Sequence, residues 1–563
     1  REHAYAHEVL LCLQTNRKMD DPGRMRFGTP EFYVKTPLEM ETLFDWIPES
    51  VANTARIAEL CSFSFEKGEI QLPAFPIPEG ADMASVLREN AFSGLSRRLG
   101  RDLSPEETER LSTELQVIED MGFPGYFLIV AELRRWAASQ GIATGPGRGS
   151  AAGSLVSYAT GITDVNPLVH GLNFSRFLNP ARREMPDIDL DFCVERRQEV
   201  IEHIVAMYGR SNVSQIVTFN RMKAKSVIRD VVRALGLPFE LGDRLSRMAA
   251  KENDPNASLE EIMEAVPQIA QSASSDETVA KVIDLCKVLE NHVKNTSVHA
   301  AGVIIAPGDL LDFVPLYQSK NEIMTQYEMR SLDRAGLMKL DVLGLRTVTV
   351  LQKAERMVVE SGCDDFSLDS IPLDDPETLA LIRSGETTGV FQLEGSGMRE
   401  ALRKIGVNRF EDVTAAVAIF RPGSMHMIDT YAQNKQGMEA GNGFRISYLH
   451  PELEDVLSET YGVMIYQEQV MAIAHRLSGM TMSEADVFRK AISKKNAAIM
   501  ARQRDRFVEG ATGRGIQKKT AVDIFDQIEK FAEYGFNKSH AVSYALLAFR
   551  TAYMNAHHPA RFM

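Results

Sequence analysis

The sequence predicts an α+β fold divided among several domains, and three observations support this class. The chain has 563 residues with 44% hydrophobic and 25% charged composition, which suffices for several cores and exceeds the size of one domain. Up to Arg346, segments of strand character interrupt helical ones. After Arg346 the pattern is predominantly helical to the end.

The first boundary is predicted near the proline-rich stretch 71–80, which reads as an extended connection. A helix should begin at Ser104, because this N-cap residue is followed by Pro105 and by Glu107, which completes a capping box. The helix should end before Gly122.

A second helix is predicted over 125–140, with Arg134 and Arg135 on its polar side. A glycine-rich loop, a further helix and an aspartate-rich strand follow. The stretch 221–289 reads as a helical, charged insertion. Strand character returns at AAGVIIAP and GLMKLDVLGL.

The aspartate-rich segment MPDIDLDF places Asp187, Asp189 and Asp191 at alternate positions, so all three carboxylates should share one face of a strand. Such a row repels itself and needs a cation. Carboxylates without nearby His or Cys favour Mg²⁺ or Mn²⁺ over zinc. An EF-hand is excluded because Phe192 and Gln198 occupy its glycine and glutamate positions. An edge strand with an acidic solvent face is the alternative.

A second strand, GLMKLDVLGL, places Leu337, Lys339 and Asp341 on one face. Charged side chains on an otherwise apolar strand are costly unless they serve a site or form a buried Lys–Asp pair. Adding Asp341 to Asp187 and Asp189 would create a carboxylate set for two metal ions about 3.5–4 Å apart, as used in phosphoryl transfer.

The loop GPGRGSAAGS is not a Walker A motif, and its match to the dinucleotide fingerprint at Gly147, Gly149 and Ala152 is weak. Glycine amides at a helix N-terminus, with Arg148 and Ser150 beside them, instead predict a phosphate cradle. A tight turn with a helix cap is the alternative.

Basic side chains cluster twice on predicted helices, and a solvated face is the usual explanation. The later segment YGFNKSHAVSY combines rings with charge, which suits nucleic acid, although core packing explains the rings nearly as well. The members of these three groups are Lys223, Lys225, Arg229 and Arg233; Arg489, Lys490, Lys494 and Lys495; and Tyr534, Phe536, Lys538, His540 and Tyr544.

The bulk composition restricts the function class. A net charge of −14 weakly disfavours nucleic acid but permits a local basic groove. Five scattered cysteines favour a reducing cytoplasm, and the apolar run 541–549 is too short for a bilayer, so we expect no membrane insertion. The chain begins at Arg1 and stops inside a helical pattern, so we expect a piece of a longer polypeptide.

Together these motifs resemble the C-family bacterial replicative polymerases, the alpha subunits of DNA polymerase III. Each motif alone is weak, but jointly they are highly specific along nearly the whole chain. The segments that carry the resemblance are GPGRGSAAGSLVSY, MPDIDLDF, HAAGVIIAP, GLMKLDVLGLRT, GVFQLEGSGM, FRPGSM and FAEYGFNKSHAVSYALLAFRTAY.

The resemblance implies a nucleotidyltransferase-type palm with a mixed β-sheet, an inserted helical thumb, and mostly helical fingers. Most metal ligands of the N-terminal PHP domain are missing, so phosphoesterase activity there is not supported. The implied domains are a PHP remnant at 1–56, palm at 57–218 and 297–346, thumb at 219–296, and truncated fingers at 347–563.

The resemblance also implies residue roles. Asp187, Asp189 and Asp341 would be catalytic and hold two Mg²⁺ ions, with Mn²⁺ as a possible substitute, whereas Asp191 lies outside the family's triad. The implied nucleotide- and phosphate-binding residues are Gly149, Ser150, Lys339, Arg489, Lys490 and His540, beside Arg148; the thumb residues Lys223, Lys225, Arg229 and Arg233 would contact DNA.

The function implied is template-directed DNA synthesis, in which a deoxynucleoside monophosphate passes from a dNTP to a primer 3′-hydroxyl with release of pyrophosphate. Partners implied are primed DNA, dNTPs, a sliding clamp, a proofreading exonuclease and clamp-loader subunits. A two-metal nuclease or phosphoesterase would not need the triphosphate cradle, and a non-catalytic DNA-binding scaffold would not need the aspartates.

Overall fold

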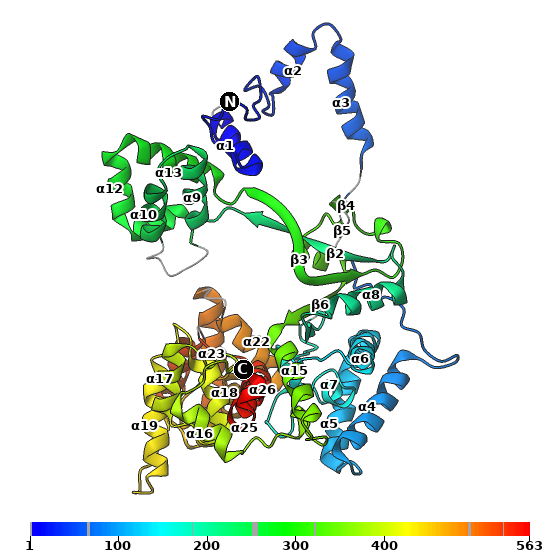
Figure 1. Cartoon of the computed structure of the whole chain (residues 1–563), viewed down its shortest axis with the longest axis vertical. Helices are drawn as coiled ribbons and strands as arrows, with labels where there is room; N and C mark the ends of the chain where they lie inside the picture. Colours follow the sequence, from blue (N-terminus) through cyan, green and yellow to red (C-terminus); the bar gives the residue numbers. More distant parts are fainter. Residues whose placement is uncertain are drawn as a thin grey trace. The chain divides into compact units, whose positions relative to one another are not determined.

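A computed structural model describes residues 3–62, 64, 68–182, 184–249, 257–319, 322–493, 497–532 and 534–563. Helices dominate these residues, and one mixed sheet has the strand order β1-β6-β3-β2-β5-β4 (Figure 1). The predicted α+β class is therefore confirmed. The chain forms two compact units: the first unit is Arg1–Glu69, Gln215–His299 and Val314–Gly336, and the second unit is Ile70–Ser214, Ala300–Phe313 and Leu337–Met563.

The first unit has its own apolar core, built mainly by helices of the predicted insertion. In α9, Val227, Ile228, Val231 and Val232 are buried at helical spacing against α1 and α13. Strands β4 and β5 pair as an antiparallel hairpin. The elements are α1 (Ala4–Thr15), α2 (Pro37–Leu43), α3 (Pro48–Leu60), β2 (Val213–Arg221), α9 (Ala224–Ala234), α10 (Phe239–Ala249), α11 (Leu259–Ala265), α12 (Pro267–Ser275), α13 (Glu277–Leu289), β4 (Leu316–Ser319), β5 (Glu322–Thr325) and α14 (Met329–Ala335).

The second unit places strands β1 and β6 in parallel and β3 antiparallel to β6. Ile188, Leu190 and Phe192 are buried with Met338 and other apolar side chains in a core that continues into helices α4 to α8. The elements are α4 (Met83–Leu99), α5 (Pro105–Asp120), α6 (Pro124–Ser139), α7 (Leu155–Ala159), β1 (Asp189–Cys193), α8 (Arg197–Tyr208), β3 (Val293–Ile305) and β6 (Met338–Leu345), with β2 and β3 each continuing from one unit into the other.

The remainder of the second unit is helical, as predicted for the sequence after Arg346. Its longest helix, α25 (Lys538–His557), is buried along most of its length and packs against α18 and α16. The other helices are α15 (Arg346–Glu360), α16 (Pro376–Ser384), α17 (Ser396–Ile405), α18 (Phe410–Ile419), α19 (Met427–Glu439), α20 (Glu454–Leu457), α21 (Gln467–Ser478), α22 (Met482–Ile492), α23 (Ala497–Gly513), α24 (Lys518–Phe531) and α26 (Pro559–Phe562).

The predicted start of α5 is confirmed: the Ser104 side chain accepts from the Glu107 amide, and Glu107 bonds back to the Ser104 amide. The predicted orientation of Arg134 is wrong. This side chain is buried, because its guanidinium donates to Thr144, to the carbonyl of Ile162 and to Asp164. These partners come from other segments, so helical periodicity could not reveal them.

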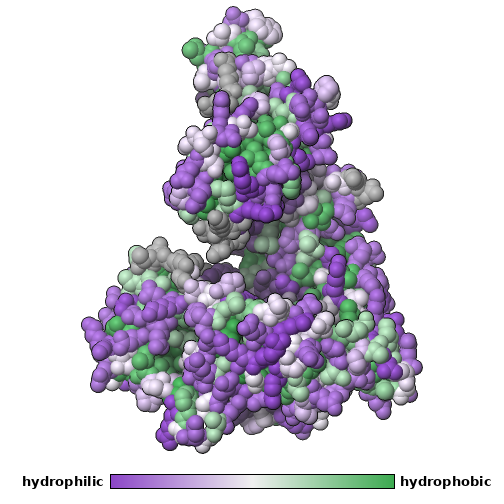
Figure 2. Space-filling model, turned by 60° about the vertical axis from the view of Figure 1, so that its left-hand side comes forward, coloured by the Kyte–Doolittle hydropathy of each residue, from purple (hydrophilic) through white to green (hydrophobic). Residues whose placement is uncertain are grey.

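The face shown in Figure 2 is largely hydrophilic. Among the helices that the structure describes, none has the length and apolar character required to cross a bilayer.

Candidate active site

The structure brings Asp187, Asp189 and Asp341 together. Asp189 on β1 lies directly opposite Asp341 on β6, because the two strands are parallel neighbours in this register. One carboxylate oxygen from each of the three aspartates lies within 4.8 Å of the others. Asp189 and Asp341 are half-buried, whereas Asp187 is exposed.

The strand is shorter than MPDIDLDF predicted, since β1 begins only at Asp189. Pro186 has no amide proton, and the Ile188 amide donates to the buried Tyr126 hydroxyl at 3.0 Å instead of to a neighbouring strand. Asp187 therefore lies on the segment that leads into the sheet. The apolar face remains as predicted, because Ile188, Leu190 and Phe192 are buried.

The proximity of the carboxylates affects their ionisation. Burial, followed by repulsion from Asp187 and Asp341, raises the pKa of Asp189 to about 7. A divalent cation would remove this repulsion and favour the ionised form.

Two basic side chains flank the aspartates. Lys339 Nζ lies 2.8 Å from Asp341 Oδ2 and 3.7 Å from Asp187 Oδ1. Arg148 Nε lies 3.5 Å from Asp189 Oδ2, and its Nη1 lies 3.5 Å from Asp191 Oδ1. The Lys–Asp pair considered from sequence is therefore formed, and it adjoins the other aspartates.

The aspartates fit a hard divalent cation. All candidate ligand atoms are carboxylate oxygens, which suits Mg²⁺ or Mn²⁺. Asp341 Oδ1 is also buried without a hydrogen-bond partner among the described residues. A bound cation would satisfy this oxygen.

The glycine-rich loop lies beside the aspartates. Gly147 has φ +136°, and a Cβ there would lie 3.1 Å from Thr163 Cγ2, so glycine is required. The loop is followed only by short helices, and the phosphate cradle expected at a helix N-terminus stays a prediction. A single 3-10 turn and the five-residue α7 follow it, because Ser154 caps a new helix at Leu155.

His540, at the start of α25, contacts this loop. The Gly149 amide donates to its Nδ1 at 3.0 Å, so the ring proton is on Nε2. Burial, with repulsion from Arg148 and Arg421, lowers the pKa of His540 to about 4, so the ring is neutral at pH 7. Its ring also packs on Tyr544, whose hydroxyl accepts from Arg148 at 2.8 Å.

A cavity of about 340 Å³ adjoins the aspartates, within the size range of small-molecule sites. Arg176 and Arg182 line it, and sequence reasoning did not select either one. Their position shortly before MPDIDLDF was the available signal. The other lining residues are Gly149, Ser150, Phe177, Leu178, Asn179, Glu184, Met185, Asp187, Asp189, Phe536, Asn537 and His540.

Arg489 and Lys490, both on α22, are not among the described residues lining this cavity. Arg489 donates to Asp486 at 2.9 Å and to Gln467 at 3.3 Å. Lys490 donates to Glu184 at 2.8 Å, and Glu184 does line the cavity. Lys494 and Lys495 lie outside the described residues.

The other aromatic and basic residues of YGFNKSHAVSY have separate environments. Phe536 lines the cavity and lies under the Arg421 guanidinium, 3.5 Å from the ring centroid. Lys538 is buried and pairs with Glu459 at 2.8 Å. Tyr534 is exposed.

The predicted DNA-binding residues belong to the first unit. Lys223 caps α9 and is exposed, as are Arg229 and Arg233, whereas Lys225 is half-buried. Arg229 lies 3.4 Å from Asp243. Arg233 lies 3.4 Å from Asp230, so the charges of these two arginines are partly compensated within the helical insertion.

Comparisons with known proteins identify two domains in this chain. Residues 85–344 match the family model of the bacterial DNA polymerase III alpha NTPase domain, and residues 347–515 match that of the alpha subunit finger domain. Asp187, Asp189 and Asp341 all fall within the first matched stretch.

Curated relatives include the DNA polymerase III alpha subunits of three bacteria. The Escherichia coli protein is 45% identical over 99% of this chain and 49% of its own length. The Thermus aquaticus protein is 41% identical and the Aquifex aeolicus protein 42% identical, each over 100% of this chain and 51% of the relative. The chain therefore spans about half the length of these relatives.

The two matched domains define a protein of the bacterial DNA polymerase III alpha class. The chain belongs to the family of bacterial DNA polymerase III alpha subunits.

Proposed function

We propose that this chain is the catalytic core of a template-directed DNA polymerase that adds deoxynucleoside monophosphates to a primer 3′-hydroxyl. The observation that carries the proposal is that Asp189 and Asp341 lie opposite each other on adjacent strands. Asp187 is close enough for all three carboxylates to bind the same metal ions. The adjoining cavity and the family membership support a nucleotide as the substrate.

Asp187, Asp189 and Asp341 would hold two divalent ions, with Mg²⁺ as the proposed metal and Mn²⁺ as a substitute. When bound, such ions activate the primer hydroxyl and neutralise charge that develops on the departing pyrophosphate. Lys339 would keep Asp341 oriented and reduce the net negative charge near the primer terminus or triphosphate.

The incoming nucleotide would occupy the 340 Å³ cavity. Gly149, Ser150, Arg176 and Arg182 would bind its phosphates, because they combine backbone or hydroxyl donors with guanidinium groups. The neutral His540 would offer its Nε2 proton to the sugar, since Nδ1 already accepts from the Gly149 amide.

The fingers residues would act in two ways. Lys490 would release Glu184 and bind a phosphate oxygen of the nucleotide instead. The carboxylate and the phosphate both carry negative charge, and Glu184 lies at the edge of the cavity. Arg489 would reach the triphosphate only after leaving Asp486 and Gln467.

The domain boundaries, the DNA contacts and the partners are part of the same proposal. The palm, thumb and fingers boundaries would be those given by the sequence, and Lys223, Lys225, Arg229 and Arg233 would contact the DNA backbone. Primed DNA and dNTPs would be the substrates. A sliding clamp, a proofreading exonuclease and clamp-loader subunits would be partners in the bacterial cytoplasm.

Primer extension tests the proposal, using a full-length alpha subunit that carries this sequence. Asp341→Asn should lower the extension rate by at least about 100-fold, because one metal ligand loses its charge. Asp120→Asn is the matched control, since Asp120 is an exposed carboxylate at the end of α5. The control should extend primers at the parent rate, and both variants should bind primed duplex equally.

Equal extension by Asp341→Asn and the parent would contradict the site assignment. Release of nucleotides from DNA without any incorporation would instead identify a nuclease. Binding of DNA with neither reaction would identify a scaffold.

A further inference from the structure

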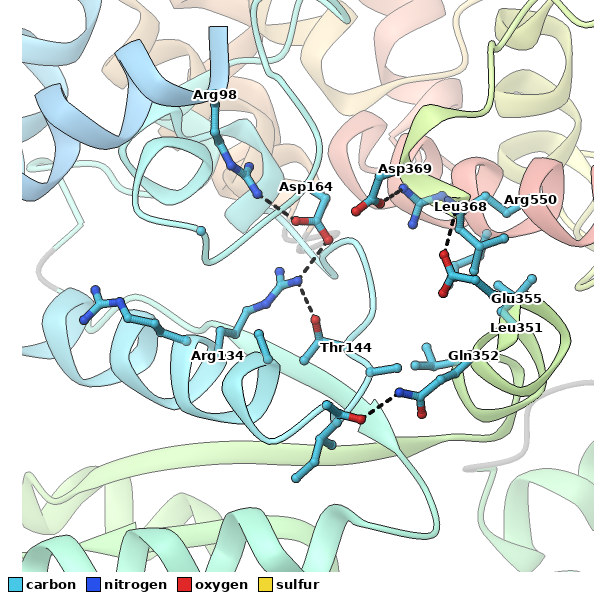
Figure 3. A pocket seen from close by; sticks show the side chains of 18 of the residues that line it. Arg98, Arg134, Thr144, Asp164, Leu351, Gln352, Glu355, Leu368, Asp369 and Arg550 are labelled. Atoms are coloured by element: carbon cyan, nitrogen blue, oxygen red, sulfur yellow. Dashed lines mark hydrogen bonds and ion pairs between the residues drawn. The ribbon is translucent and has the colours of Figure 1, made fainter. Parts of the chain in front are cut away.

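A second cavity, of about 670 Å³, lies in the second unit away from the residues assigned to catalysis. Helices α4, α6, α15 and α25 contribute to its walls, and Figure 3 shows it from close by. None of its described lining residues also lines the 340 Å³ cavity. Its volume falls in the range of small-molecule sites.

Arginine dominates the charge of this cavity. Five arginines and three carboxylates line it, with no lysine among the described residues, which leaves two positive charges. The whole chain carries a net charge of −14, so this concentration is local. The charged lining residues are Arg97, Arg98, Arg134, Arg135, Arg550, Asp164, Glu355 and Asp369.

Two carboxylates hold three of the arginines in place on facing walls (Figure 3). Arg98 and Arg134 each lie 2.9 Å from Asp164, while Arg550 lies 2.6 Å from Asp369. Guanidinium groups fixed in this way lose little further freedom when they bind an anion.

Several donors remain without a partner. Arg97 and Arg135 make no hydrogen bond or ion pair with any residue that the structure describes, and both are exposed. The Nε of Arg550 is buried and has no hydrogen-bond partner among the same residues. The exposed Arg97 and Arg135 can therefore bind a ligand without first breaking a contact.

The rest of the wall includes apolar side chains. Ile142, Val348, Leu351 and Leu547 line the cavity, so it offers apolar surface as well as charge. A planar guanidinium fork matches phosphate oxygens better than an ammonium group does. Arginines on α4, α6 and α25 converge from different directions. This arrangement suits a small polyanion better than a long polyanionic polymer.

We propose that this cavity binds a linear di- or triphosphate group, which Arg97, Arg98, Arg135 and Arg550 contact. The phosphate group could be inorganic or carried by a nucleoside, whose base would lie on the apolar wall. This site is separate from the proposed polymerase site and does not depend on it.

Calorimetric titration of the 563-residue chain with sodium tripolyphosphate tests the proposal, with EDTA present. Without a divalent cation, the three catalytic carboxylates repel a polyanion and suppress binding there. We expect saturable binding of one ligand. The double variant Arg97→Ala/Arg135→Ala should weaken it roughly 10- to 100-fold, because two charge-assisted contacts are lost.

The double variant Arg210→Ala/Arg445→Ala is the matched control, since it removes the same charge from exposed arginines of the second unit outside the cavity. It should bind like the parent, as should Lys490→Ala. Absence of binding, equal weakening by the control, or weakening only by Lys490→Ala would each overturn the proposal. Melting temperatures establish that the variants fold.

A second titration with a nucleoside triphosphate distinguishes the two ligand sources. Tighter binding than tripolyphosphate, lost in Arg97→Ala/Arg135→Ala, supports a nucleotide. Equal affinity supports recognition of the phosphate chain alone.

Discussion

At the scale of single residues, the alternation of aspartates produces two different environments. Asp189 joins Asp187 and Asp341, whereas Asp191 is buried next to Arg148. Both carboxylate oxygens of Asp191 lack a hydrogen-bond partner among the described residues, so its contact with Arg148 is electrostatic. Asp191 therefore holds Arg148 beside Asp189 and lies outside the group of three carboxylates that come together.

The raised pKa of Asp189 predicts a pH dependence for metal binding. Below pH 7 a cation must displace the proton that Asp189 holds, since its pKa is about 7. Mn²⁺ affinity should therefore fall about tenfold per unit as pH decreases below 7 and level off above it. Electron paramagnetic resonance of free Mn²⁺ measures this affinity.

Asp189→Asn provides the control for this prediction. It should weaken Mn²⁺ binding at every pH and abolish the slope below pH 7, because the titrating group is gone. An unchanged slope in Asp189→Asn would assign the titration to another group.

At the scale of secondary-structure elements, buried charges connect helices of the second unit. Lys435 on α19 is fully buried, and its Nζ lies 3.3 Å from Asp412 on α18, which is also fully buried. The same Nζ donates to Asn408 at 2.9 Å and to the Gly406 carbonyl at 3.0 Å. The ion pair thus fixes how α18 and α19 pack.

Lys435→Met should destabilise the second unit by about 3–5 kcal/mol, because Asp412 would remain buried with less compensation. Urea unfolding measures the change. Lys404→Met is the matched control: Lys404 on α17 is half-exposed and pairs with exposed Asp429, so its loss should cost less than about 1 kcal/mol. Equal costs for both variants would show that Asp412 is stabilised by its other partners, which are Tyr431, the Asn408 amide and Arg409.

At the scale of the whole molecule, the chain contains two units with separate cores. Leu245 on α10 is fully buried in the first unit, among residues of α9 and its neighbours. Leu115 on α5 is buried in the second unit, in the core that also contains side chains of the sheet that carries the aspartates. Separate cores allow separate unfolding.

Leu245→Ala should lower the stability of the first unit by about 2–5 kcal/mol and leave Mn²⁺ binding by the second unit unchanged. Leu115→Ala should instead lower the stability of the second unit and its Mn²⁺ binding, and leave the stability of the first unit unchanged. Scanning calorimetry with parallel Mn²⁺ titration measures both effects. A single transition that shifts equally in both variants would show that the units unfold together.

Much of this organisation was predictable from the sequence. Ser104 and Glu107 determined the start of α5 through contacts three residues apart. Ile188, Leu190 and Phe192 indicated a buried face, and Lys339 with Asp341 indicated a charged face on the second strand. These patterns depend on local periodicity, which a chain displays directly.

Strands β2, β4 and β5 were not predicted, because they are short or partly polar. The pairing of β2 with β5 also joins distant parts of the chain, whereas β4 pairs with its neighbour β5. The burial of Arg134 and the contribution of Arg176 and Arg182 to the cavity also depend on distant partners.

The sequence by itself therefore determined the helical character, the α+β class and the family, since these follow from local spacing and from motifs along the chain. Only the tertiary structure decided that Asp341 lies opposite Asp189, that His540 faces Gly149, and that arginines from three helices line one cavity. The physical reason is that such contacts join residues far apart in the chain, and strand register and helix packing bring them together.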